Sequence, residues 1–181
     1  MAGLRKGVSY RRLERPYTRK SKFKHKSYVK AVPNSKVVRF DMGDIKKQYA
    51  VRVDLIAKDA LQIRHNAIES ARQIINRHLN LKLGNNYYFK VRMYPHHVLR
   101  ENKMLTGAGA DRMQTGMQLA FGRPVGIAAQ IKRGKAIFSV KVDKQDIDSA
   151  KFSLRKARSR LPGHYGLAVT ILVPEVVTQE E

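Results

Sequence analysis

Apolar residues recur with two different spacings along this chain, and each spacing predicts a different kind of element. Residues 49–56, YAVRVDLI, alternate apolar and polar side chains, which is typical of a strand with one buried face. Residues 36–40 and 87–94 predict two further strands, the second closed by Pro95. Residues 167–173, LAVTILV, are nearly all apolar, and this favours a central strand that is buried on both faces.

Two other segments repeat their apolar residues every three or four positions and therefore predict amphipathic helices. The first helix is expected to begin at Asp59, which would act as its N-cap, and to end near Asn80. The second is expected to begin near Asp143 or Asp146 and to run to about Arg160.

The remaining strands are expected at residues 126–132 and 135–142, joined as a hairpin around Arg133-Gly134. The element order predicts an α+β fold, in which two amphipathic helices pack on a mixed, mostly antiparallel sheet to make a sandwich. The length suggests one domain with appendages.

We expect four parts in this chain. Residues 1–32 form a basic extended arm, and residues 33–174 form the single α+β domain. Within that domain, the glycine-rich residues 101–118 show little regular period and predict a long flexible loop. Residues 175–181 are an acidic tail that is expected to fray.

The arm carries most of the candidate nucleic-acid contacts. Its first 30 residues hold eleven Lys or Arg against one acid, Glu14, with aromatic residues between them. Aromatic and basic residues together favour RNA, because bases and riboses offer faces for stacking. The alternative is a solvated, disordered tail that binds nothing. The arm residues expected to bind RNA are Arg11, Arg12, Arg15, Arg19, Lys20, Lys22 and Lys24.

The second predicted helix adds a basic ridge. Lys151, Arg155 and Arg158 recur at i, i+4 and i+7, beside the apolar stripe. A helix with one face in the core and a cationic ridge outside can lie along a phosphate backbone. The alternative is an ordinary solvated helix face.

Composition supports a polyanionic partner. The formal net charge is +23 over 181 residues, and repulsion within such a surface favours binding to nucleic acid. A membrane partner is not expected, because no run of about 18 apolar residues and no lipidation signal is present. The chain has no cysteine, which excludes disulfides, thiolate metal sites and cysteine nucleophiles.

The sequence contains no complete motif for catalysis, cofactor binding or metal binding. The segment GAGADR after residue 106 lacks the Lys-Ser or Lys-Thr of a phosphate-binding loop and the third glycine of a dinucleotide site. His96 and His97 are adjacent, so they point apart on a strand and suit one metal poorly. Three aspartates at 143–148 are explained by the start of a helix. We expect no catalytic residue, metal, cofactor or small-molecule substrate.

Several long stretches resemble one family. Residues 95–124, PHHVLRENKMLTGAGADRMQTGMQLAFGRP, are similar to the large-subunit ribosomal protein family called L-sixteen in bacteria and L-ten-e in archaea and eukaryotes. RPYTRK (15–20), PNSKVVRFDMGD (33–44) and KARSRLPG (156–163) resemble its archaeal and eukaryotic branch, and the short acidic C-terminus resembles the archaeal form. This resemblance implies an α+β sandwich with a hammerhead-like β excursion.

The resemblance also implies a function. It implies a structural protein of the cytoplasmic ribosome that contacts large-subunit rRNA, tRNA and neighbouring ribosomal proteins, beside the aminoacyl-tRNA site. The protein would help to position tRNA and to complete subunit assembly, while catalysis belongs to the rRNA. A loop would reach toward the peptidyl-transferase centre, with Asn102, Lys103, Met104, Gly107, Gly109, Asp111, Arg112 and Gln114 as its site residues. A generic RNA-binding chaperone and an RNA-modifying enzyme remain the alternatives.

Overall fold

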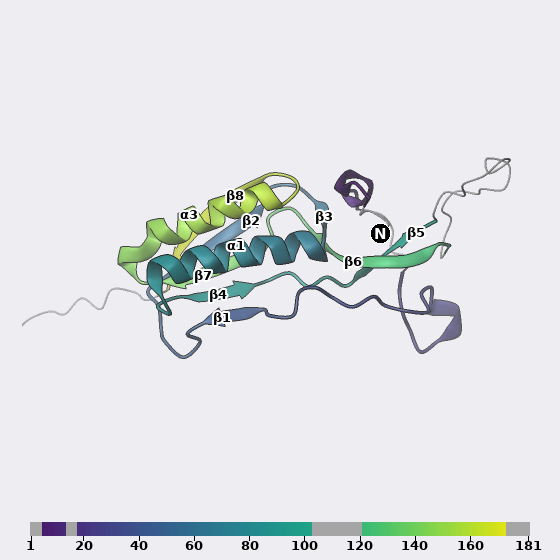
Figure 1. Cartoon of the computed structure of the whole chain (residues 1–181), viewed down its shortest axis with the longest axis horizontal. Coiled ribbons are helices and arrows are strands. Elements are labelled where there is room, and N and C mark those ends of the chain that lie inside the picture. Colours follow the sequence, from purple (N-terminus) through teal and green to yellow (C-terminus); the bar gives the residue numbers. More distant parts are fainter. Residues whose placement is uncertain (1–4, 14–17, 103–120, 173–181) are drawn as a thin grey trace, which may run out of the picture.

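Two antiparallel sheets organise the chain in the computed structural model, which describes residues 5–13, 18–102 and 121–172 (Figure 1). The larger sheet has, in spatial order, the strands β1 (Asp41–Gly43), β4 (Tyr88–Val91), β7 (Ala136–Val142), β2 (Val51–Ala57) and β8 (Tyr165–Ile171). The smaller sheet has the strands β3 (Leu61–Arg64), β6 (Arg123–Ile131) and β5 (His97–Glu101). Every strand pair in these described sheets is antiparallel.

Two helices, α1 (His65–Leu83) and α3 (Ile147–Ala157), lie side by side over one face of the five-stranded sheet (Figure 1). Short 3-10 turns flank α3, with η3 (Lys144–Asp146) before it and η4 (Arg158–Arg160) after it. The core lies between helices and sheet, where Leu55 and Leu154 are both fully buried. The expected α+β fold is therefore confirmed. In the described residues, neither helix is long and apolar enough to cross a lipid bilayer.

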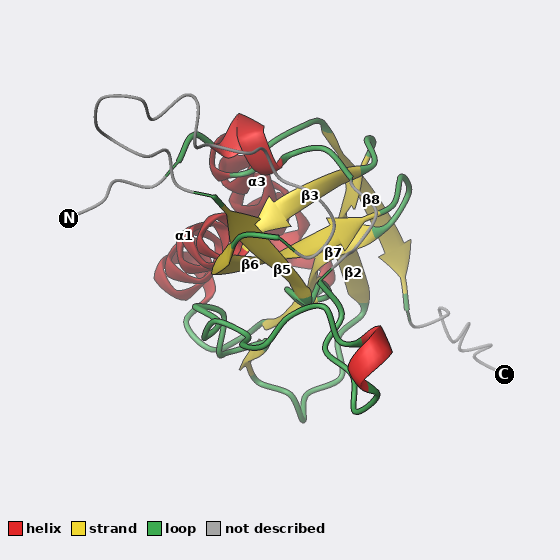
Figure 2. Cartoon of the chain, turned by 90° about the vertical axis from the view of Figure 1, so that its right-hand side faces the viewer, coloured by secondary structure: helices red, strands yellow, loops and turns green. Residues whose placement is uncertain are grey.

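The smaller sheet carries the chain beyond the helices. Strands β5 and β6 run out past the end of α1, away from the five-stranded sheet (Figure 1). Seen from that end, the three strands lie in front of the larger sheet and the helices (Figure 2). This projection agrees with the β excursion that the family resemblance implies. β5 itself was absent from the sequence prediction.

The start of the first helix was predicted wrongly. Asp59 does not cap it, because residues 61–64 form β3 and α1 begins only at His65. Leu61–Arg64 pair with Ile131–Ala128 of β6, and Ile63 is fully buried as a strand residue. The spacing of Ile63 to the next apolar residues fits a helix as well as a strand. Pairing with the distant β6 therefore decides that this segment is a strand.

The predicted hairpin and the predicted central strand were also wrong. The strands on either side of Arg133-Gly134 lie in different sheets, since β6 pairs with β3 and β5, whereas β7 pairs with β4 and β2. β8 lies at the edge of its sheet and not at the centre, and Ile171 near its end is 67% exposed. An apolar run therefore did not indicate burial on both faces here.

The strand expected at residues 36–40 is displaced toward the C-terminus. Ser35 makes a local turn, with its Oγ accepting from the backbone N–H of Val37 at 3.1 Å. Val37 is then buried while Val38 is 79% exposed, and ladder pairing starts only in β1. The second helix was placed closely, except that its last turn, Arg158–Arg160, is a 3-10 turn.

Candidate RNA interface

The first half of the basic arm is fixed to β3 by hydrogen bonds that its backbone carbonyl oxygens accept. The backbone N–H of Gln62 donates to the carbonyl oxygen of Arg11 at 2.9 Å, and the Gln62 side-chain amide donates to the carbonyl oxygen of Tyr10 at 3.0 Å. Arg64 donates through its guanidinium to the carbonyl oxygen of Arg5 at 3.0 Å. The 3-10 turn η1 (Gly7–Tyr10) is held at the sheet by these contacts.

Glu101, at the end of β5, holds the same part of the arm by charge. Its carboxylate lies 2.9 Å from Nε of Arg5 and accepts a hydrogen bond from the hydroxyl of Tyr10 at 3.5 Å. The guanidinium of Arg64 lies over the Tyr10 ring, 5.8 Å from its centroid. Burial, followed by the negative charge of Glu101, raises the pKa of Tyr10, so its hydroxyl remains a donor at neutral pH.

A second anchor lies beyond residue 17. Oγ1 of Thr18 and Nδ1 of the buried His97 are 2.9 Å apart, which joins the arm to the start of β5. Burial, and then electrostatic interaction with His96 and Arg100, lower the pKa of His97. The ring is therefore neutral at pH 7.

A small satellite core completes this anchor. Val29 of the arm is buried with Val98 of β5 and Ile127 of β6. The backbone N–H of Tyr28 donates to the carbonyl oxygen of Arg19 at 2.7 Å, which closes the intervening segment on itself. That segment contains the 3-10 turn η2 (Lys24–Lys26). The described parts of the arm are thus folded onto the projecting sheet.

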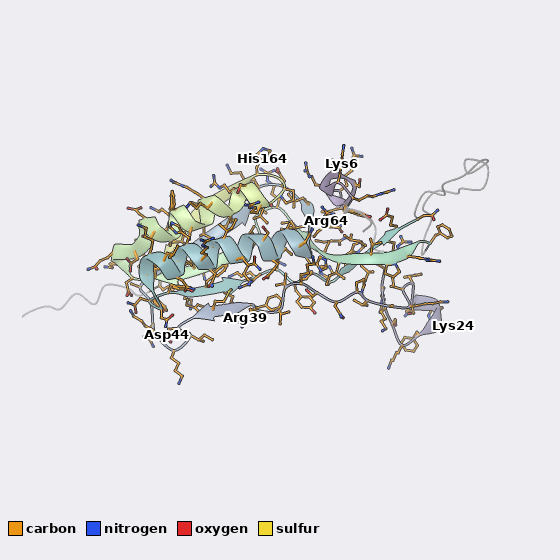
Figure 3. The ribbon with its side chains drawn as sticks, in the orientation of Figure 1. Lys6, Lys24, Arg39, Asp44, Arg64 and His164 are labelled. Atoms are coloured by element: carbon orange, nitrogen blue, oxygen red, sulfur yellow. The ribbon has the colours of Figure 1, made fainter. Side chains whose placement is uncertain are left out.

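The basic side chains of the arm point outward even though its backbone is anchored. Lys6 and Lys24 lie on opposite sides of the projecting sheet, beyond the end of α1 (Figure 3). The arm cations that were predicted to bind RNA and that the structure describes are all exposed: Arg11, Arg12, Arg19, Lys20, Lys22 and Lys24. Arg15 lies outside the described residues. The structure thus gathers the arm cations at one end of the molecule.

The basic ridge of the second helix lies elsewhere. Arg155 and Arg158 are exposed on α3 and η4, as predicted. Lys151 is partly covered, and its Nζ lies 3.6 Å from the carboxylate of Asp148. α3 packs over the five-stranded sheet, whereas β5 and β6 project past the end of α1 (Figure 1).

The predicted glycine-rich loop begins at the tip of the projecting sheet. Glu101 of β5 pairs with Arg123 of β6, so these strands end side by side where the loop departs and returns. Asn102 is partly exposed at this tip. The other predicted loop residues lie outside the described residues: Lys103, Met104, Gly107, Gly109, Asp111, Arg112 and Gln114.

The aspartates near α3 have roles that differ from the expected capping. Asp146 occupies the N-cap position without a side-chain hydrogen bond to the helix. Asp143 instead pairs with Lys47, whose Nζ lies 2.8 Å from its carboxylate. Within residues 5–13, 18–102 and 121–172, no group of three or more His, Asp or Glu could hold a metal ion.

The anchoring residues were missed by sequence reasoning. Gln62, His97 and Glu101 each contact the arm from more than 50 positions away in the chain, so no local pattern indicates the pairing. The sequence signal for anchoring was the presence of two hydroxyl groups, on Tyr10 and Thr18, within a basic segment. Such groups form hydrogen bonds when they become buried in a folded chain.

Comparison with known proteins assigns the chain to a family. The family model described as ribosomal protein L16p/L10e matches residues 13–168. Large ribosomal subunit protein uL16 of Staphylothermus marinus is 47% identical over 148 residues, which cover 81% of this chain and 82% of the relative. The uL16 proteins of Archaeoglobus fulgidus and Methanocella arvoryzae are 46% and 43% identical, over 84% and 90% of this chain and 85% and 92% of their own length. The chain therefore belongs to the ribosomal protein L16p/L10e family, in its archaeal form.

Proposed function

We propose that this protein is a non-enzymatic, structural constituent of the large subunit of the cytoplasmic ribosome and binds large-subunit rRNA. One observation carries the proposal furthest. The arm is fixed to the sheet by its backbone and by Tyr10, Thr18 and Val29, while its cations stay exposed. Membership of a ribosomal protein family and a net charge of +23 support the same partner.

Anchoring makes the arm a better ligand for RNA than a free basic tail. A disordered tail loses conformational entropy when it binds, whereas a backbone that is already docked loses less. Each phosphate that the arm neutralises releases counterions and adds affinity. Contacts from Arg and Lys to phosphate fix position and orientation with little reading of base sequence. The arm and the α3 ridge then both contribute cations that anchor the protein on folded rRNA.

The finer location is also part of the proposal. We place the protein beside the aminoacyl-tRNA site, where it helps to position tRNA and to complete subunit assembly. The similarity of residues 95–124 to the family supports this placement. The loop of residues 102–115, which leaves from the outer tip of the projecting sheet, reaches toward the peptidyl-transferase centre. Neighbouring ribosomal proteins complete the set of partners.

Sedimentation tests this function. Tagged protein expressed in a related archaeon should co-sediment with large subunits and remain there after a high-salt wash. Release into the soluble fraction at moderate salt contradicts a structural role. Direct binding separates the alternatives, because a generic RNA chaperone has similar affinity for DNA duplex and rRNA, whereas a subunit constituent strongly prefers folded large-subunit rRNA. Turnover of rRNA or tRNA with Mg²⁺ present would instead indicate an RNA-modifying enzyme.

A further inference from the structure

Phe152 occupies the outward face of α3. The residues of α3 that face the core are Ala150, Ser153, Leu154 and Ala157, whereas Phe152 keeps 48% of its surface exposed. A single exposed apolar side chain is common on protein surfaces and needs no explanation by itself. The neighbours of this ring are the informative feature.

The Phe152 ring lies among cations and a histidine. The ring of His78 on α1 is 4.9 Å away between centroids and tilted by 48°. The ammonium of Lys156 lies 4.7 Å from the centroid of the Phe152 ring. Lys82 follows His78 by one turn of α1 and is exposed. Burial, and then the charges of Lys156 and Lys82, lower the pKa of His78. The ring thus lies where α1 and α3 meet, with a cation from each helix nearby.

We propose that the Phe152 ring is a stacking site for an unpaired nucleotide of rRNA, and that Lys156 and Lys82 bind its flanking phosphates. This inference rests on the proposed rRNA-binding function. It adds a specific contact with a nucleotide at the surface formed by α1 and α3. Exposed aromatic rings next to cations suit single-stranded RNA, because the base stacks while the backbone is neutralised.

The charge pattern favours RNA over a protein partner. The acid nearest to Phe152 on its own helix, Asp148, lies one turn away beside Lys151. Arg155 is exposed one turn after the ring and adds to the positive field. Lys156 has a flexible stem, so an incoming base can displace its ammonium from the ring to a phosphate. A weak cation–π contact is then exchanged for a base stack and an ion pair.

Two substitutions at residue 152 separate stacking from mere apolar contact. Phe152→Leu keeps apolar volume but removes the ring, whereas Phe152→Tyr keeps the ring. With the full chain and large-subunit rRNA, Phe152→Leu should bind roughly five- to a hundredfold more weakly. Phe152→Tyr should bind like the wild type. The salt dependence of binding should not change in Phe152→Leu, because the ring neutralises no phosphate.

Lys156→Gln provides an independent measurement. Loss of one phosphate contact should reduce the magnitude of the negative slope of log K against log salt concentration by about one unit. Thermal unfolding of the three variants should lie close to that of the wild type, since residues 152 and 156 are both exposed. A slope that does not change shows that Lys156 faces solvent and contradicts its part in the site.

Other outcomes overturn the proposal without touching the proposed function. If Phe152→Leu binds rRNA like the wild type, or Phe152→Tyr loses as much affinity as Phe152→Leu, no base stacks on the ring. If Phe152→Leu binds rRNA normally but is retained less by intact subunits with their proteins, the ring contacts a protein. Failure of the wild type to prefer large-subunit rRNA contradicts the proposed function itself.

Discussion

Asp59 fastens the turn that precedes β8 by accepting two hydrogen bonds from His164. Its Oδ2 lies 3.0 Å from the backbone nitrogen and 2.9 Å from Nδ1 of the His164 ring. Because a carboxylate only accepts, Nδ1 must carry the proton. These bonds lower the pKa of Asp59. The turn contains Gly163 at φ +85°, where an added Cβ would lie 2.3 Å from Cδ2 of Leu61.

Gly163→Ala should therefore destabilise the domain by about 1–3 kcal/mol, because an L-residue at this positive φ is strained and its methyl group meets Leu61. Gly134→Ala is the matched control, since Gly134 has φ +81° but nothing within 4 Å of an added Cβ. Urea denaturation should show the smaller loss for the control. Equal losses would mean that the close approach to Leu61 contributes nothing.

Acidification should weaken the docking of the arm through His97. The lowered pKa of His97 means that the unfolded chain binds its proton more readily than the folded chain. Stability is therefore fully present above the unfolded value of about 6.5 and falls as the pH drops through it toward the lower folded value. The protection factor of the Tyr28 amide, which compares its hydrogen-exchange rate with that of an unstructured peptide at the same pH, should fall from pH 7.5 to pH 5.5.

His97→Gln is the control for this pH effect, because glutamine does not titrate in that range. The variant should lose part of the pH dependence of unfolding and keep the share due to His65 and His78, whose pKa values are also lowered by burial. An unchanged pH dependence in His97→Gln would show that Thr18 and His97 do not couple the arm to protonation.

Reversal of the α3 ridge should weaken binding to rRNA. Arg155→Glu with Arg158→Glu removes two exposed cations. The magnitude of the negative slope of log K against log salt concentration should therefore decrease by roughly 1.5 to 2 units. Filter binding at four salt concentrations measures it. Lys46→Glu with Lys58→Glu changes the net charge equally at two exposed positions that are not part of the ridge. A slope equally low in both variants would assign the effect to net charge alone.

Deletion of residues 103–113 should leave the domain folded, because both sheets and both helices form outside this segment. Circular dichroism and thermal unfolding check this. In cells, the deletion should slow translation more than it reduces incorporation into large subunits. Unfolding of the isolated variant contradicts the expectation that the domain folds without the loop. If the variant is incorporated poorly, but the subunits that do contain it translate normally, the assignment of the loop to the tRNA side is wrong.

The α+β class and most elements could be predicted from the sequence, because alternation in β2 and the three-four repeat in α3 are local signals. The ends of elements and the pairing of strands could not. Leu61 and Ile63 suit helix and strand equally, and their partners in β6, Ile131 and Ala129, lie 70 and 66 residues later. The turn at Gly134 was predicted, but a turn alone does not decide whether its two strands pair or separate into different sheets.

The candidate interface was predictable only where local sequence signals indicated it. Charge runs indicate cations directly, so the arm and Arg155 were found from composition and spacing. The partners that hold the arm, Gln62 and Glu101, belong to elements whose proximity only the fold creates. Phe152 was overlooked because its surroundings include His78, which comes from the other helix.

The anchoring of the arm also has a consequence for the order of folding. The arm is synthesised first, yet Thr18 meets His97 over a separation of 79 residues and Tyr10 meets Glu101 over 91. Closing loops of this length costs entropy that only a formed sheet can offset. We therefore expect the arm to dock last, so that a nascent chain displays its cations as a loose polyelectrolyte until β3, β5 and β6 have assembled.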